Sequence, residues 1–171
     1  MTRQDLMPGL LRLQQYMQNF YPERKLSDFP VEFWRNPDDD LYWETLLYFP
    51  LHVDEIDEKA PKGFRLAYPI FHLEDDYMIN GWTALTNAGE DRLPNAIWAY
   101  REIGLSSEAA ALSAALESIR RTPDDEGAAE AAYRAVVLPP IGDDAREAFL
   151  FAYFRAHRSL FEANDGRAAA V

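Results

Sequence analysis

Residues 106–140, SSEAAALSAALESIRRTPDDEGAAEAAYRAVVLPP, decide the fold class of this chain. Alanine, the strongest helix former, dominates two runs that Thr122-Pro123 separates and that Pro139-Pro140 ends. Ser107 stands where a helix N-cap is wanted, and Glu108 follows in the first turn, where the helix dipole favours negative charge. We therefore expect two helices here, one to about Arg121 and a second over 124–138.

The remaining sequence predicts further helices on both sides of this segment. Residues 74–87 should form a helix that Gly89 ends in the left-handed conformation, and residues 92–103 a second that ends at Gly104. The last helix should begin at Asp143 or Asp144 and run to about Ala163.

The N-terminal half carries weaker signals. Residues 6–20 have apolar side chains three and four apart, which is the spacing of a helical face. Asn36-Pro37 is typical of a helix start, and Pro50 is expected to close that helix before an acidic loop over 51–62. In the segment 64–71 apolar residues partly alternate, as in a strand, but Phe71 favours a helix.

The fold that these patterns predict is all-α, a single compact multi-helix domain over residues 1–166 with about seven helices, followed by a frayed tail over 167–171. The core should contain the residues on the apolar stripes of the helices. These are Trp82, Ile97, Trp98, Ile103, Leu112, Leu116, Phe149, Tyr153 and Leu160.

The net charge of the chain limits the kinds of partner that it can bind. Lys and Arg total 17 and Asp and Glu total 29 in 171 residues, which gives a net charge of −12. This balance excludes a nucleic-acid binder that neutralises phosphates, and it argues against docking on an anionic membrane. A basic protein is the natural electrostatic complement. The first residues lack the uninterrupted apolar region of a secretory signal, and we expect the protein to be cytoplasmic.

Catalytic and metal-binding motifs are missing from the sequence. Cysteine is absent, and the three histidines match no zinc or iron spacing. His72 lies close to three carboxylates at 74–76, but a carboxylate cluster at a helix start explains this arrangement better than half a metal site. The glycines are scattered and form no phosphate loop. We therefore expect a protein that is not an enzyme, with no catalytic residue, metal or cofactor.

The most unusual stretch runs from Asp38 to Glu58. It holds eight acids in 21 residues and no Lys or Arg, and its aromatic residues are interleaved with the acids. One interpretation is a helix start with a complemented dipole followed by a solvated acidic loop. The other is a recognition face. Crowded like charges destabilise a fold, so a cluster this dense suggests a function. The candidate partner-binding residues are Asp38, Asp39, Asp40, Glu44, Asp54, Glu55, Asp57 and Glu58.

A second candidate region has the sequence Tyr77-Met78-Ile79-Asn80-Gly81-Trp82, followed by Asn87-Ala88-Gly89 and then by Ala99-Tyr100-Arg101-Glu102-Ile103-Gly104-Leu105. Over about 74–116 this pattern resembles the bacterial DNA-mimic protein family, whose members are small, acidic and helical. The resemblance implies an interaction function and no chemistry.

The physics of the same motif favours a structural role, with a small pocket as the alternative. Gly81 would allow close approach of another helix or relieve strain, Trp82 would fill the core, and Asn87 and Gly89 would close the helix. The pocket would be lined by Asn80, Trp82 and Asn87.

Three functions remain open at this point. The first is an acidic protein that occupies the DNA-binding face of a basic partner, such as a transcriptional regulator or a nucleoid protein. The second is a toxin-neutralising or immunity-type binder. The third is a small-molecule site around Asn80 and Trp82. The first two functions differ in whether DNA competes with this chain for its partner. The third function requires a deep pocket.

Overall fold

The computed structural model describes residues 12–13, 15–23, 48–52, 56, 60–123, 125–136, 141 and 143–161. Every regular element in these residues is a helix, so the all-α prediction is confirmed for the part of the chain that is described. The chain divides into two compact units, unit 1 with residues 1–65 and 154–171 and unit 2 with residues 66–153. The prediction of one domain over 1–166 stays a prediction.

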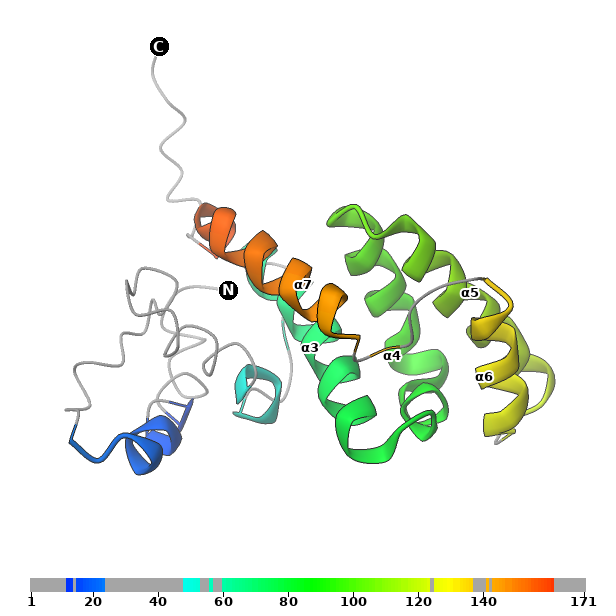
Figure 1. Cartoon of the computed structure of the whole chain (residues 1–171), viewed down its shortest axis with the longest axis horizontal. Coiled ribbons are helices and arrows are strands. Elements are labelled where there is room, and N and C mark those ends of the chain that lie inside the picture. Colours follow the sequence, from blue (N-terminus) through cyan, green and yellow to red (C-terminus); the bar gives the residue numbers. More distant parts are fainter. Residues whose placement is uncertain are drawn as a thin grey trace, which may run out of the picture. The chain divides into compact units, whose positions relative to one another are not determined.

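Three neighbouring helices pack together in unit 2 (Figure 1): α4 (Thr83–Glu102), α5 (Ser106–Arg121) and α6 (Glu126–Arg134). The helix α4 packs against α5 and α6, and α5 packs against α6. Half of the buried residues of these helices are alanines, whose small side chains let two helices approach closely. The fully or almost fully buried alanines of these helices are Ala84, Ala88, Ala96, Ala99, Ala109, Ala111, Ala115 and Ala129.

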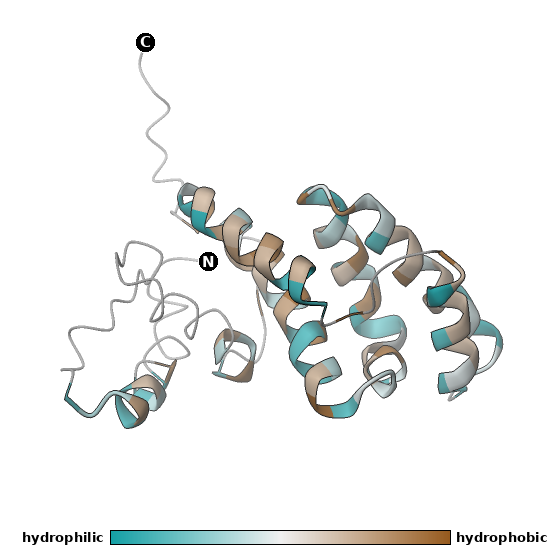
Figure 2. Ribbon diagram, viewed as in Figure 1, coloured by the Kyte–Doolittle hydropathy of each residue, from teal (hydrophilic) through white to brown (hydrophobic). Residues whose placement is uncertain are grey.

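Two further helices are α3 (Lys62–Asn80) and α7 (Asp144–Ala156), and the 3₁₀ turn η3 (Arg158–Phe161) follows α7. The segment 64–71 is helical and belongs to α3, which decides the ambiguity between strand and helix. Pro69 lies inside α3 and cannot donate to the carbonyl four residues earlier, yet the helix continues. Hydrophobic and hydrophilic residues are interleaved along every long helix, as amphipathic helices require (Figure 2).

The predicted helix over 74–87 has the wrong bounds. The chain leaves α3 at Gly81, whose φ is 60°, a conformation that glycine adopts without the steric cost of a Cβ. Gly89 does interrupt the helix, as predicted: its φ of 51° and ψ of −153° are not helical, and two helical segments of α4 meet there at a kink, although this conformation is not the expected left-handed helical one. Gly104, with φ 93°, does follow the end of α4, so that prediction is confirmed.

The caps also differ in part from the expectation. Ser107 is not an N-cap, because α5 begins at Ser106 and the cap position is Leu105, which makes no side-chain cap. Asp125 caps α6 and accepts the N–H of Ala128 at 2.9 Å. At the start of α7, the carboxylate of Asp143 accepts the N–H of Ala145 at 2.9 Å. The helix α7 ends at Ala156, earlier than the expected end near residue 163.

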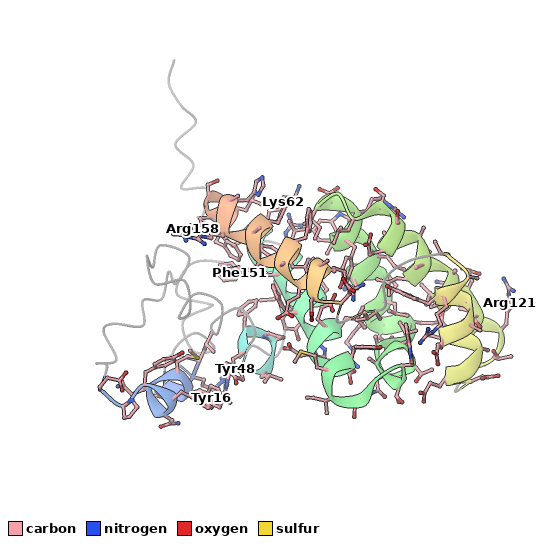
Figure 3. All side chains as sticks on the ribbon, in the orientation of Figure 1. Tyr16, Tyr48, Lys62, Arg121, Phe151 and Arg158 are labelled. Atoms are coloured by element: carbon pink, nitrogen blue, oxygen red, sulfur yellow. The ribbon has the colours of Figure 1, made fainter. Side chains whose placement is uncertain are left out.

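The described residues of unit 1 make several aromatic contacts. Residues 15–20 and 48–52 are helical, and the second stretch continues past Pro50, which was expected to end it. The rings of Tyr16 and Tyr48 lie 4.9 Å apart (Figure 3). Phe161 contacts Phe64 edge-on, with ring centroids 5.2 Å apart. Beside that contact a Cβ added to Gly63 would lie 2.7 Å from the Phe161 ring, so this glycine permits a close approach.

The predicted core is correct for four of its nine members. Ile97, Ile103, Leu112 and Leu116 are buried. The two tryptophans, with Tyr153 and Leu160, are only partly buried, and Phe149 is 40% exposed. Phe149 stacks on Tyr153 along α7, with ring centroids 6.2 Å apart, and does not enter the interior. No helix within the described ranges has the length and apolar character needed to cross a membrane.

Candidate functional site at the corner of α3 and α4

The acidic stretch is not placed by the structure. All eight candidate partner-binding residues lie outside the described residues. These are Asp38, Asp39, Asp40, Glu44, Asp54, Glu55, Asp57 and Glu58. The other candidate region, the Asn80–Gly89 motif, is fully described, and the site is built from it.

The turn between α3 and α4, residues 76–83, is named here the α3–α4 corner. The amide of Asn80 donates to the carboxylate of Asp76 at 2.7 Å, and the amide of Asn87 donates to the same oxygen at 3.2 Å. The N–H of Gly81 donates to the carbonyl of Tyr77 at 2.8 Å and ends α3. The two asparagines of the predicted motif therefore meet on one carboxylate that was not part of the prediction.

Trp82 braces this corner and does not fill the core. Its indole is partly buried between Tyr77, at a centroid distance of 5.2 Å, and Tyr133 of α6, at 5.3 Å. The guanidinium of Arg134 lies 4.9 Å above the indole in a cation–π contact. The hydroxyl of Thr83 donates to Glu126 at 2.7 Å and adds a second connection from the corner to α6.

Gly81 has a conformational role and no packing role. A Cβ added there would meet nothing within 4 Å, so the expected close approach of another helix is wrong. Gly81 is required because its φ is positive. Gly89 interrupts the helix at the kink of α4, as expected. The carbonyl of Asn87 accepts Arg92, which lies beyond the kink.

Arg92 connects the kink of α4 to α3. One guanidinium nitrogen lies 3.0 and 3.2 Å from the two ring nitrogens of His72, and the other donates to the Asn87 carbonyl. Burial, together with the positive charge of Arg92, lowers the pKa of His72, and the nearby Asp76 opposes this shift. On α3, His72, Asp76 and Asn80 are spaced by four and form one polar stripe that faces the kinked part of α4.

A second polar cluster is buried in unit 2. Arg146 of α7 donates to Glu74 of α3 from Nε at 2.9 Å and from Nη2 at 3.3 Å, and both side chains are almost fully buried. The hydroxyl of Tyr100 also donates to Glu74, and Tyr133 lies 3.4 Å from the Arg146 guanidinium. Burial raises the pKa of Tyr133 to about 12, so its hydroxyl stays protonated. The cluster ties α3, α4 and α7 together at the Glu74 carboxylate, and the Arg146–Tyr133 contact extends it to α6.

Residue 75 is the least satisfied carboxyl in the described part of the chain. The Oδ2 atom of Asp75 is buried and has no hydrogen-bond partner among the described residues. Burial, with the adjacent Glu74 carboxylate, raises the pKa of Asp75 from 3.8 to about 8. At neutral pH this side chain is therefore mostly an uncharged acid.

The surface of unit 2 is strongly acidic. Residues 66–153 contain 15 acids, six arginines and no lysine, so their formal charge is 6 − 15 = −9. Three of the arginines are engaged with carboxylates of the same unit: Arg120 with Glu90 and Glu117, Arg134 with Glu130, and Arg146 with Glu74. Arg121, at the end of α5, is exposed (Figure 3).

The polar side chains of the corner bond to one another. The amides of Asn80 and Asn87 each donate one hydrogen bond to Asp76. No group of three His, Asp or Glu side chains that could hold a metal ion is found among the described residues. The hydrogen bonds of the motif are internal, which agrees with a structural role, although the close approach at Gly81 and the burial of Trp82 in the core are wrong. The pocket alternative stays a prediction.

No protein-family model matches the chain, and neither curated proteins nor solved structures give a match. The resemblance to the bacterial DNA-mimic family therefore stays a prediction.

Proposed function

We propose that this chain is a non-enzymatic acidic protein that binds a basic protein partner, and that it mimics DNA on the partner's nucleic-acid-binding face. The partner would be a transcriptional regulator or a nucleoid protein, and the binding would take place in the cytoplasm. Carboxylates would pair with the Lys and Arg side chains that otherwise meet phosphate.

The observation that carries the proposal is the excess of acids in unit 2. With 15 acids against six arginines and no lysine, most carboxylates of residues 66–153 have no basic side chain of the same unit to match them. Self-repulsion of this size works against the compact state, whereas a basic partner would relieve it on binding. The eight further acids of residues 38–58 add to the same imbalance.

The test begins with the full chain immobilised as bait and a lysate of its host, followed by identification of the bound protein. Affinity of the purified partner is then measured by calorimetry at rising salt, with and without duplex DNA as competitor. A charge-driven complex should weaken steeply as salt rises, and DNA should displace the chain. An enzyme partner that DNA does not displace would support the toxin-neutralising alternative and contradict DNA mimicry.

Two sets of amide substitutions test which acidic residues contribute to partner binding. The first removes four acids of the acidic stretch: Asp54→Asn, Glu55→Gln, Asp57→Asn and Glu58→Gln. The control removes the same charge from exposed acids of α4 and α5: Glu90→Gln, Asp91→Asn, Glu102→Gln and Glu117→Gln. The first set should slow association with the partner at low salt more than the control set does. Equal association rates for the parent and both variants would refute a charge-driven function.

A further inference from the structure

We infer that Met78 and Ile79, at the end of α3, are the apolar anchor of the partner-binding surface, and that they receive a basic amphipathic segment of the partner. This inference rests on the proposed function and names the chemistry of the segment that is bound. The segment carries large apolar side chains flanked by Lys or Arg.

The first argument is exposure. Met78 is 68% exposed and Ile79 is 75% exposed, while the next most exposed large hydrophobic residue of unit 2 among those described is Phe149, at 40%. The two residues are consecutive in the last turn of α3, and both of their side chains are exposed. We call them together the α3 patch. Exposing them contributes nothing to folding, and an exposed apolar patch with a polar rim is typical of an interaction site.

The second argument is rigidity. The two residues lie between Asp76 and Gly81, in the last turn of a helix whose end is fixed by the Asn80–Asp76 and Gly81–Tyr77 hydrogen bonds. Asn87 of α4 adds a second bond to Asp76. An anchor that is already held in place loses little conformational entropy on binding, which favours affinity.

The third argument is the charge around the patch, which determines what kind of partner segment can bind there. Asp76 lies in the same turn of α3, and the Thr83–Glu126 bond places the acidic start of α6 beside the corner. The basic side chain that contacts the corner, Arg134, is paired with Glu130 at 2.6 Å. A second copy of this chain would bring acids against acids, so charge complementarity favours a basic segment over self-association.

The size of the patch defines its role. Two side chains are far smaller than the roughly 800 Å² that each partner contributes to a stable interface. Met78 and Ile79 would therefore act as a hot spot inside a larger charged footprint, with carboxylates as the polar rim.

The test uses the full chain labelled at the methyl groups of Met and Ile, and two synthetic probes. One is a helical lysine–leucine peptide with leucines three and four apart, and the other replaces every leucine with glutamine at the same charge. The lysine–leucine peptide should shift the methyl signals of Met78 and Ile79 in a saturable way. The double variant Met78→Gln, Ile79→Gln should bind it about tenfold more weakly, which corresponds to ~1.4 kcal/mol.

A matched control is Phe149→Gln, which removes an exposed apolar side chain on α7 and should leave the affinity within about twofold of the parent. Binding of the double variant as tight as that of the parent would overturn the anchor, as would equal affinity for the two peptides. In both cases the charge-driven function would stand. If neither peptide bound at low salt, the proposed function and the anchor would fall together.

Discussion

Replacing Asp75 with asparagine tests whether α3 buries an uncharged acid at neutral pH. The buried Oδ2 atom has no hydrogen-bond partner among the described residues, and burial beside Glu74 raises the pKa of Asp75 to about 8. Asparagine has nearly the same shape and cannot ionise. The substitution therefore removes the cost of keeping this carboxyl protonated and leaves the packing in place.

The sign and size of the effect follow from the two pKa values. The folded pKa lies above the ordinary value of 3.8, so between these values the folded state binds the proton that the unfolded state has lost. Stability that the parent has at low pH is consequently lost as pH rises through this window, at about 1.4 kcal/mol for each pH unit. At pH 7 the accumulated loss is about 4 kcal/mol, and Asp75→Asn should recover up to that amount.

The assay is urea unfolding of the parent and the variant at each pH unit from 4 to 8. The difference in the free energy of unfolding should be small near pH 4 and grow toward pH 8, with similar m values for the two proteins. Asp91→Asn, which changes an exposed aspartate of α4, is the control and should show no such growth. A difference that is constant with pH, or an Asp75→Asn variant less stable than the parent at pH 7, would refute the reasoning.

Three other substitutions test the packing of the helices by the same unfolding measurement. Glu74→Gln alone should cost about 3–5 kcal/mol because it leaves the buried Arg146 charge unpaired, whereas Glu74→Leu with Arg146→Met should keep most of the stability; equal losses would contradict a coupled pair. Gly63→Ala should cost about 1–3 kcal/mol, since the new Cβ would lie 2.7 Å from the Phe161 ring, and a stabilised variant would show that this contact is loose. Gly81→Ala should cost about 1–2 kcal/mol and Gly81→Asn less, because φ is 60° there; equal stability of all three forms would argue against a left-handed turn.

The helical class could be predicted because it depends on local signals. Alanine-rich runs and proline breaks mark α5 closely, and Asp125 and Asp143 lie where the sequence suggests a helix start. The helix α6 ends at Arg134, four residues before the predicted end at 138. Serine at 106–107 was misjudged as a cap because a residue that can cap a helix need not do so.

The boundary between α3 and α4 could not be chosen from sequence alone. Asn80-Gly81 and Asn87-Ala88-Gly89 both have the composition of a helix end, and both glycines interrupt helical geometry, Gly81 between α3 and α4 and Gly89 at the kink of α4. Across the kink at Gly89, Arg92 donates to the Asn87 carbonyl and contacts His72 on another helix. Such a tertiary contact leaves no mark on the local pattern.

The same reasoning explains the missed residues of the buried cluster. Glu74 and Arg146 are 72 residues apart in the chain, so no spacing rule pairs them. One signal was present: Arg146 lies in the first turn of α7, where the helix dipole disfavours a positive charge. A cation in that position indicates a partner strong enough to offset the dipole, and the buried carboxylate of Glu74 is that partner.

The distribution of charge between interior and surface bears on the proposed function. Arg146 and Glu74 neutralise each other inside unit 2, and Asp75 is mostly uncharged at pH 7. Of the 15 acids of residues 66–153, 13 then remain against five arginines, a surface charge of 5 − 13 = −8. Solubility alone would account for such a charge, but it would not favour an exposed Met78 and Ile79 in a braced corner. An acidic surface with one apolar patch is complementary to a basic amphipathic partner. The two-peptide experiment separates the contribution of charge from that of the patch.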